Sequence, residues 1–168
     1  MGTCGSVPSV KEGPIDSDLI SFRDEILKKH NEIRQLHGSP ELTPNTSLNN
    51  KAQDYAKQIL DSQGKKAFPA NTYNDSAVGE NVIISSKKEP NEIFEKWYNE
   101  KNSYDFSLNK FQKGTGHFTQ IVWKETKEIG IGLEKDDKNN ICCVALYYPG
   151  GNVIGEFSSN VKDSINFK

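Results

Sequence analysis

The sequence predicts an α/β fold in which a small, mostly antiparallel β-sheet carries helices on its faces. Segments with helical periodicity of apolar residues come first in the chain. Short apolar runs typical of strands come later, and only a polar connector separates the last two. The 168 residues fit one globular domain and leave too little chain for two independent cores. We therefore expect the order helix, helix, strand, helix, helix, strand, strand.

Two amphipathic helices are predicted in the first part of the chain. From Ser17, apolar residues recur at spacings of three, four or seven until Gly38 and Pro40, a pair that commonly ends a helix. A second apolar face begins after Pro44 and continues to Gly64. Each pattern indicates a helix with one face turned toward the core.

The remaining elements are shorter. A β-branched apolar run predicts a strand over 78–86, and an apolar stripe after Pro90 predicts a third helix. The segment 115–124 is interpreted as a short helix. Two further strands are expected at 129–134 and 141–148.

The composition excludes several classes of protein. A formal net charge of −2 provides no basic field for sequence-independent nucleic-acid binding. No apolar run approaches the roughly 18 residues that span a bilayer, and no secretory signal pattern is present at the N-terminus. Of the three cysteines, Cys142 and Cys143 are adjacent in a predicted strand, so they point to opposite faces and do not easily pair. This usage is typical of a reducing compartment.

The N-terminus matches a lipidation pattern. Gly2 follows the initiator methionine and Ser6 is a small hydroxyl residue, as in N-myristoylation sites. One myristoyl chain binds a membrane only marginally, and a palmitoylated Cys4 would supply a second anchor. The alternative is a chance match among small residues. We predict a flexible acylated leader at 1–14 and a folded domain at 15–168.

Three polar residues are candidates for chemistry. Glu80, Glu100 and His117 supply two carboxylates and an imidazole, which are the side chains of metal sites and of acid–base catalysis. Nothing in their spacing shows that they converge. In the alternative interpretation, Glu100 is an exposed helix residue and His117 is bonded locally at a helix start.

Long motifs in the chain resemble a known family. Gly116–Lys124 and Tyr147–Asn152 are similar to the two signature segments of the cysteine-rich secretory, antigen 5 and pathogenesis-related (CAP) superfamily. The similarity extends over most of the chain and is strongest to an intracellular, acylated subgroup with few cysteines. Three further segments support it: His30–Arg34, Gly79–Val82 and Trp97–Glu100.

The resemblance implies a three-layer α-β-α sandwich with a cleft that holds two histidines and two glutamates. Glu80, Glu100 and His117 match three of these four positions. The position of the other histidine falls within 66–69, where this chain has Lys-Ala-Phe-Pro. The tetrad is therefore incomplete.

The loss weakens the expected metal chemistry, because imidazoles are the expected zinc ligands in family members that bind zinc. Glu80, Glu100 and His117 would form a weak, unselective divalent-metal site, and a metal-assisted hydrolase is kept as an alternative function. His30 matches a structural family position. We expect His37 to face solvent or to interact with the last carbonyls of the first helix.

An aromatic, aperiodic stretch is the stronger functional candidate. Tyr98, Tyr104, Phe106 and Phe111 resemble the caveolin-binding-type segment that family members use for sterol binding. Flat rings on a loop can open to admit a rigid apolar ligand. The alternative is that these rings pack the loop onto the core.

These observations predict a non-enzymatic, lipid-anchored peripheral membrane protein that binds sterol or another lipid. The resemblance further implies a homodimer on the cytoplasmic face of Golgi or plasma membranes, with a caveolin-like protein as a possible partner. No firm cofactor and no nucleic-acid partner are expected. A protein-interaction module that the leader only places at a membrane is the remaining alternative.

Overall fold

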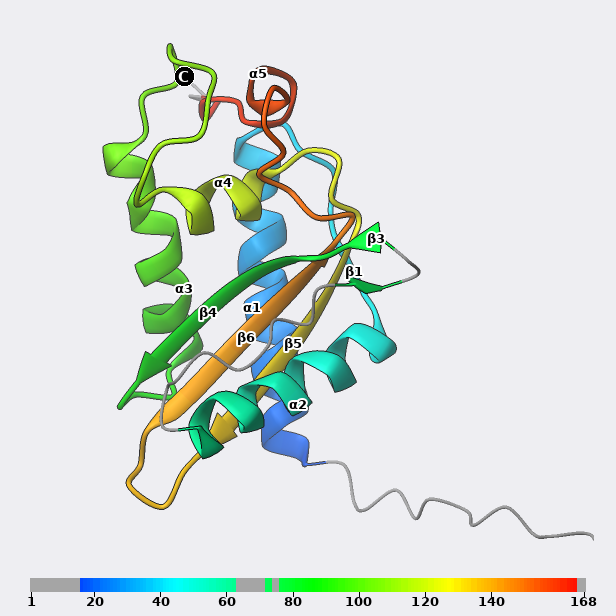
Figure 1. Cartoon of the computed structure of the whole chain (residues 1–168), viewed down its shortest axis with the longest axis vertical. Coiled ribbons are helices and arrows are strands. Elements are labelled where there is room, and N and C mark those ends of the chain that lie inside the picture. Colours follow the sequence, from blue (N-terminus) through cyan, green and yellow to red (C-terminus); the bar gives the residue numbers. More distant parts are fainter. Residues whose placement is uncertain (1–15, 63–71, 74–75, 166–168) are drawn as a thin grey trace, which may run out of the picture.

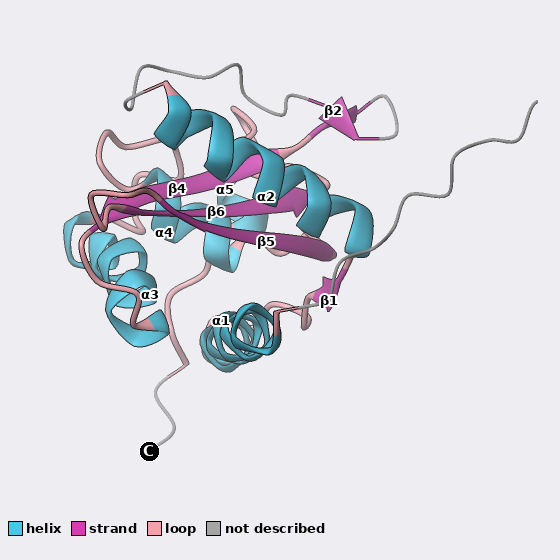
Figure 2. Cartoon of the chain, turned by 90° about the horizontal axis from the view of Figure 1, so that it is seen from below, coloured by secondary structure: helices cyan, strands magenta, loops and turns pink. Residues whose placement is uncertain are grey.

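The computed structural model describes residues 16–62, 72–73 and 76–165, and it confirms the α/β sandwich. A four-stranded sheet lies between α2 on one face and α1, α3 and α4 on the other (Figures 1 and 2). The leader, with Gly2 and Cys4, lies outside the described residues. The elements are α1 (Ser17–Leu36), β1 (Thr43–Pro44), α2 (Thr46–Asp61), β2 (Thr72–Tyr73), β3 (Ser76–Ala77), β4 (Gly79–Ser85), α3 (Pro90–Tyr98), the 3₁₀ helix η1 (Asn99–Ser103), α4 (Gly116–Val122), β5 (Glu128–Lys135), β6 (Ile141–Tyr148) and α5 (Phe157–Asn160).

The sheet is mostly antiparallel, as predicted. Its strand order is β1-β5-β6-β4, and β6 pairs antiparallel with both β5 and β4. Only β1 is parallel to its neighbour, over two residue pairs. The short strands β2 and β3 form a separate hairpin that the sequence pattern did not predict.

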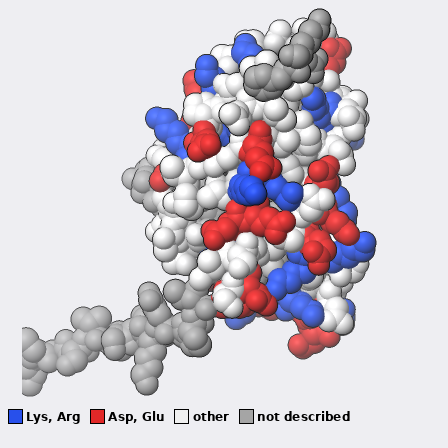
Figure 3. All heavy atoms as spheres, turned by 180° about the vertical axis from the view of Figure 1, so that it is seen from behind, with Lys and Arg blue, Asp and Glu red and all other residues white. Residues whose placement is uncertain are grey.

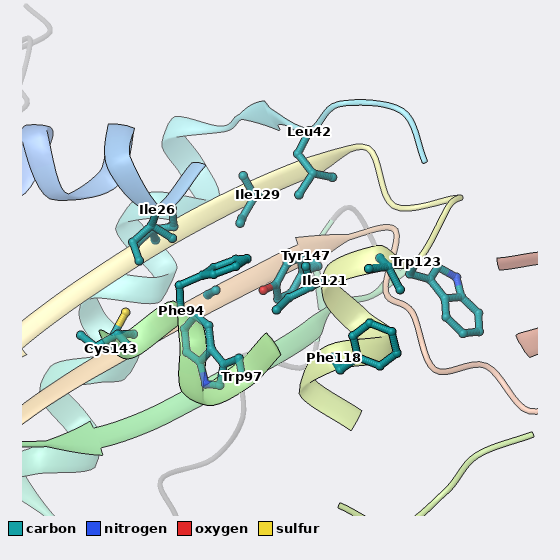
Figure 4. Close-up of a cluster of buried hydrophobic side chains, with 14 of the residues drawn as sticks. Ile26, Leu42, Phe94, Trp97, Phe118, Ile121, Trp123, Ile129, Cys143 and Tyr147 are labelled. Atoms are coloured by element: carbon teal, nitrogen blue, oxygen red, sulfur yellow. The ribbon is translucent and has the colours of Figure 1, made fainter. Parts of the chain in front are cut away.

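The central strand β6 supplies side chains to a core on each face of the sheet. Cys143 and Tyr147 face the side of α1, α3 and α4 (Figure 4), whereas Cys142 and Leu146 face α2. The two thiols are thus on opposite faces, and both are free. Burial raises the pKa of Cys142 to about 12, so this thiol is an unreactive core group.

Residues typical of helix ends lie at both ends of α1. The Asp16 side chain accepts a hydrogen bond from the Asp18 backbone N–H at 3.0 Å. Gly38, with a φ of +69°, lies just beyond the C-terminal end, where a glycine adopts the left-handed conformation easily. The buried stripe of the helix is unusual, because two of its members are the polar residues His30 and Arg34.

Arg34 joins three parts of the chain from the centre of the protein. Its buried guanidinium donates to the backbone carbonyls of Pro40, Ile121, Trp123 and Thr126 at 2.7–2.9 Å. A buried cation is costly unless its donors are satisfied, and here carbonyl oxygens provide the partners. The end of α1 is thereby fastened to both ends of the segment after α4.

Helix α2 packs directly on the backbone of β5. A Cβ atom added at Gly130 would lie 2.1 Å from the carbonyl carbon of Leu48, and one added at Gly132 would lie 2.2 Å from that of Ala52. Glycine at both positions is what allows the helix to approach this closely.

Side chains close the outer edge of β5, which β1 covers only at one end. Asn49 accepts from the Ile131 N–H at 2.7 Å, and Arg23 donates to the Ile131 carbonyl at 2.7 Å. The Gln53 amide both accepts from the Leu133 N–H at 3.0 Å and donates to its carbonyl at 2.8 Å. These groups replace a neighbouring strand and block edge-to-edge pairing.

No helix in the described part of the chain is long and apolar enough to cross a membrane. Every helix and strand that the sequence predicted within this part is present. The 3₁₀ helix η1 and the helix α5 were not predicted, because elements of four or five residues carry no periodic signal.

Candidate functional site

Glu100 and His117 meet where η1 approaches the start of α4. One carboxylate oxygen of Glu100 lies 2.7 Å from His117 Nδ1. The other accepts hydrogen bonds from the backbone N–H groups of His117 at 2.8 Å and Phe118 at 3.1 Å. Thr115, the residue before α4, makes no side-chain capping bond, so Glu100 is the N-terminal cap of the helix. Its carboxylate fixes His117 in place rather than standing free in a cleft.

Glu80 lies on the face of the sheet that α2 covers, whereas α4 lies on the opposite face. It pairs in register with Leu146, whose side chain packs with α2, and its carboxylate accepts a hydrogen bond from the Tyr55 hydroxyl. The pKa of Tyr55 is raised first by burial and then by the negative charge of Glu80. The next residue, Asn81, points to the opposite face and donates to the His117 carbonyl at 3.1 Å.

The three candidate residues are not gathered into one cluster of ligands. Among the described residues, no group of three or more His, Cys, Asp or Glu side chains is arranged to hold one. Glu100 is occupied by capping and Glu80 is bonded to Tyr55. The segment 66–69, where the family's other histidine would fall, lies outside the described residues. Hydrolysis at these residues stays a hypothesis for which the geometry provides no assembled site.

His30 belongs to a buried chain of hydrogen bonds, which agrees with its expected structural role. Its Nδ1–H donates to the Ile26 carbonyl at 2.8 Å, so Nε2 accepts from the Tyr147 hydroxyl at 2.7 Å. Asn81 donates to the same hydroxyl at 3.1 Å and continues the chain to His117. Burial lowers the pKa of His30 to about 4, so the ring stays neutral near pH 7.

The signature segments form a packing centre that residue types alone did not reveal. The buried Gln120 accepts from the Gly151 N–H at 2.8 Å and donates to the Thr126 hydroxyl at 3.2 Å. That hydroxyl donates to the Pro149 carbonyl at 2.8 Å. A Cβ atom at Gly79 would lie 1.9 Å from the Gln120 side-chain oxygen. Gly79, Gln120 and Gly151 lie in three separate segments, so the sequence alone gave no local signal for this contact.

Three of the four aromatic candidates converge. Tyr104 and Phe106 have ring centroids 5.0 Å apart, and their centroids lie 5.6 and 6.0 Å from that of Phe118 in α4. Tyr98 approaches Phe118 at 6.0 Å from another side. The fourth candidate, Phe111, is 53% exposed and contacts Phe157 instead of Phe118. We name Tyr98, Tyr104, Phe106 and Phe118 the ring cluster.

His37 is a member of this neighbourhood, and the expectation that it faces solvent or the last helix carbonyls was wrong. It is 1% exposed, its Nδ1–H donates to the Lys162 carbonyl at 2.6 Å, and its Nε2 accepts from the Tyr98 hydroxyl at 3.2 Å. The C-terminal segment crosses the end of α1, where Ile165 N–H donates to the Leu36 carbonyl, and covers the ring. A contact so distant in sequence leaves no local pattern.

The sandwich, the packed signature segments and the Glu100–His117 pair together define a protein of the CAP type. The model of the cysteine-rich secretory protein (CAP) family matches residues 27–147, and the chain belongs to this family.

Similar proteins agree with this assignment. The human Golgi-associated plant pathogenesis-related protein 1 is 38% identical over 143 residues, which cover 83% of this chain and 92% of that protein. Protein PRY2 of Saccharomyces cerevisiae is 37% identical, covering 83% of this chain and 41% of its own length. Among solved structures, Schistosoma mansoni venom allergen-like protein 4 has a TM-score of 0.59 at 25% identity and covers 83% of this chain and 90% of its own. NaASP2, solved with Zn²⁺, has a TM-score of 0.66 at 21% identity, covers 92% and 90%, and shows the fold alone.

Proposed function

We propose that this CAP protein is a non-enzymatic, lipid-anchored peripheral membrane protein that binds sterol or another lipid through the ring cluster. The observation that carries the proposal is the convergence of Tyr98, Tyr104 and Phe106 on Phe118 beside a loop. Flat apolar rings are suited to the faces of a rigid, flat apolar ligand. The capping role of Glu100 also supports a binding rather than a catalytic site.

The loop over the cluster is fastened by few bonds, which supports ligand entry. Gln112 closes it by accepting from the Asp105 N–H and donating to the Asp105 carbonyl, both at 2.8 Å. Opening breaks these side-chain bonds and exposes the contact of the partly buried Phe106 with the buried Tyr104 and Phe118, but it breaks no strand ladder. Separation of Phe106 from Phe118 would create space for the ligand without disturbing α4.

The test is sterol binding by the full-length protein, produced without acylation. Energy transfer from tryptophan to a fluorescent sterol measures affinity, and Phe106→Ala is expected to lose it. Ile84→Ala, which changes an exposed residue of β4 outside the cluster, is the matched control. Equal affinity in the wild type and in a folded Phe106→Ala variant would reject the ring cluster as the site.

The anchor and the self-association are separate parts of the proposal. Gly2→Ala is expected to move the protein from the membrane fraction of cells to the supernatant, because a second acyl chain at Cys4 depends on the first for membrane contact. Unchanged recovery with membranes would contradict the anchor. Sedimentation equilibrium tests the expected homodimer. The similarity to a Golgi-associated protein supports the Golgi as the location, and the cytoplasmic face is part of the proposal.

A further inference from the structure

Exposed apolar side chains gather at one end of the molecule. In Figure 1 this end carries α4, α5 and the loop before α4, whereas the start of α1 and the β5–β6 turn lie at the other. The exposed side chains at this end, apart from that of the C-terminal segment, are Leu108 (47%), Phe111 (53%), Val153 (42%) and Ile154 (90%). We name these four residues the apolar tip. Such a gathering marks an interaction surface more often than scattered exposed residues do.

The apolar tip is one surface although two separate segments form it. The Phe111 ring packs on Phe157 with centroids 6.4 Å apart. A Cβ atom built at Gly116 would lie 3.7 Å from the edge of Phe111 and 3.7 Å from the Asn152 amide nitrogen. Asn152 is held there because its amide donates to the Gly116 carbonyl at 2.9 Å. Val153 and Ile154 follow it directly, so they emerge beside Phe111.

Positive charge accompanies the tip. Lys110 and Lys113 flank Phe111 in exposed positions, and the stretch 107–113 contains no acidic residue. The nearest preceding carboxylate, Asp105, accepts hydrogen bonds from the N–H and hydroxyl of Ser107, which lower its pKa and keep it ionised. Glu156, beyond Ile154, is the exposed acid of the other segment. The stretch 107–113 is therefore cationic and apolar, whereas acidic and basic side chains are interspersed over the face seen in Figure 3.

We propose that the apolar tip is the surface that this protein lays on an anionic lipid bilayer. Phe111 and Ile154 would enter the acyl boundary while Lys110 and Lys113 contact head groups, the arrangement of peripheral segments with apolar and basic residues. A side chain as exposed as Ile154 projects from the surface, which suits a deformable bilayer better than a rigid protein partner. This inference rests on the proposed membrane function, and it names the face of the protein that contacts the membrane.

The acyl anchor and the tip can share one bilayer. The start of α1 lies at the other end of the molecule, and its 20 residues span about 30 Å. The 15 residues from Gly2 to Asp16 span at most about 50 Å when extended. The leader is thus long enough for Gly2 to reach the membrane that the tip contacts.

The test is flotation of full-length, unacylated protein with sterol-free vesicles of phosphatidylcholine, with or without phosphatidylserine. We expect flotation only with phosphatidylserine, weakened by salt. The double variant Phe111→Ser/Ile154→Ser should abolish it, and the matched control Ile20→Ser/Ile84→Ser, exposed at the other end, should not. Lys110→Glu/Lys113→Glu should weaken binding by at least about tenfold, because each basic residue near an anionic surface adds a favourable contribution. Lys57→Glu/Lys96→Glu, on α2 and α3, is the charge control.

The outcomes separate this inference from the proposed function. Equal loss of flotation in the tip variant and in the control variant would overturn the proposal that the apolar tip binds the bilayer. Unchanged flotation together with conversion of a dimer to a monomer in the tip variant would make the surface a contact between copies and also overturn it. The tip variant should still bind sterol in solution, since the ring cluster is intact. Wild-type flotation without any sterol binding would instead reject the proposed ligand and leave the tip standing.

Discussion

Glu100→Ala is expected to destabilise the protein by about 2 kcal/mol. Loss of an N-terminal cap costs about 1 kcal/mol, and loss of a negative charge at a helix start removes about 0.3–1 kcal/mol more. The hydrogen bond to His117 Nδ1, at 2.7 Å, is lost as well. Glu100→Gln retains one acceptor oxygen for the backbone N–H groups, so about half of the effect is expected.

Thermal unfolding followed by circular dichroism measures this effect. For a domain of this size, about 2 kcal/mol lowers the Tm by roughly 4–8 °C. Glu25→Ala, an exposed change on α1, is the control and should leave the Tm unchanged. An unchanged Tm in Glu100→Ala would refute the capping role. A rise in the wild-type Tm with added Zn²⁺ that Glu100→Ala abolishes would restore the metal hypothesis, since a ligand of the folded state stabilises it.

One pH titration and two substitutions test other buried contacts of the fold. Burial lowers the pKa of His30 to about 4, whereas the pKa of an unfolded histidine is about 6.5. As the pH falls from about 6.5 toward 4, the unfolded chain therefore binds the proton and the folded protein does not, so the free energy of unfolding decreases. NMR titration of the His30 ring should show a midpoint near 4. A midpoint near 6.5 would contradict the buried chain of bonds. Gln53→Ala removes two hydrogen bonds to Leu133 and should lower the free energy of unfolding by about 2 kcal/mol in urea. Because the β5 edge opens, light scattering should show concentration-dependent association. A monomer at all concentrations would argue against the role of Gln53 at this edge. Gly79→Ala forces the buried Gln120 amide aside and should cost at least about 2 kcal/mol, and a wild-type urea midpoint would show that the amide moves freely.

Hydrophobic periodicity predicted the elements because it reports which face of each helix or strand is buried. It was incomplete inside α1, where the buried stripe includes the polar residues His30 and Arg34 as well as the apolar Phe22 and Ile26. Polar residues can replace apolar ones there because distant segments satisfy their hydrogen bonds. A single sequence does not display such partners.

The candidate site was predictable to the same limited extent. The resemblance singled out Glu100 and His117, which do meet. It did not show that Glu100 caps α4, because this depends on the position of η1. It also grouped Glu80 with them, although the alternation of β4 places Glu80 beside α2. Family position alone therefore does not determine which side chains share a space.

The contacts that hold α4 in place bear on the proposed binding site. Glu100, Arg34 and Gln120 hold both ends of α4, through its first N–H groups, its last carbonyls and its neighbouring turn. Phe118, carried by this fixed helix, is the wall against which Tyr104 and Phe106 pack from the loop. Because α4 is held independently of the loop, the opening that we propose would break the contacts of Tyr104 and Phe106 with Phe118 without releasing α4. In the binding site that we propose, α4 with its family-signature residues forms the fixed half, and the loop before α4 forms the half that has to move.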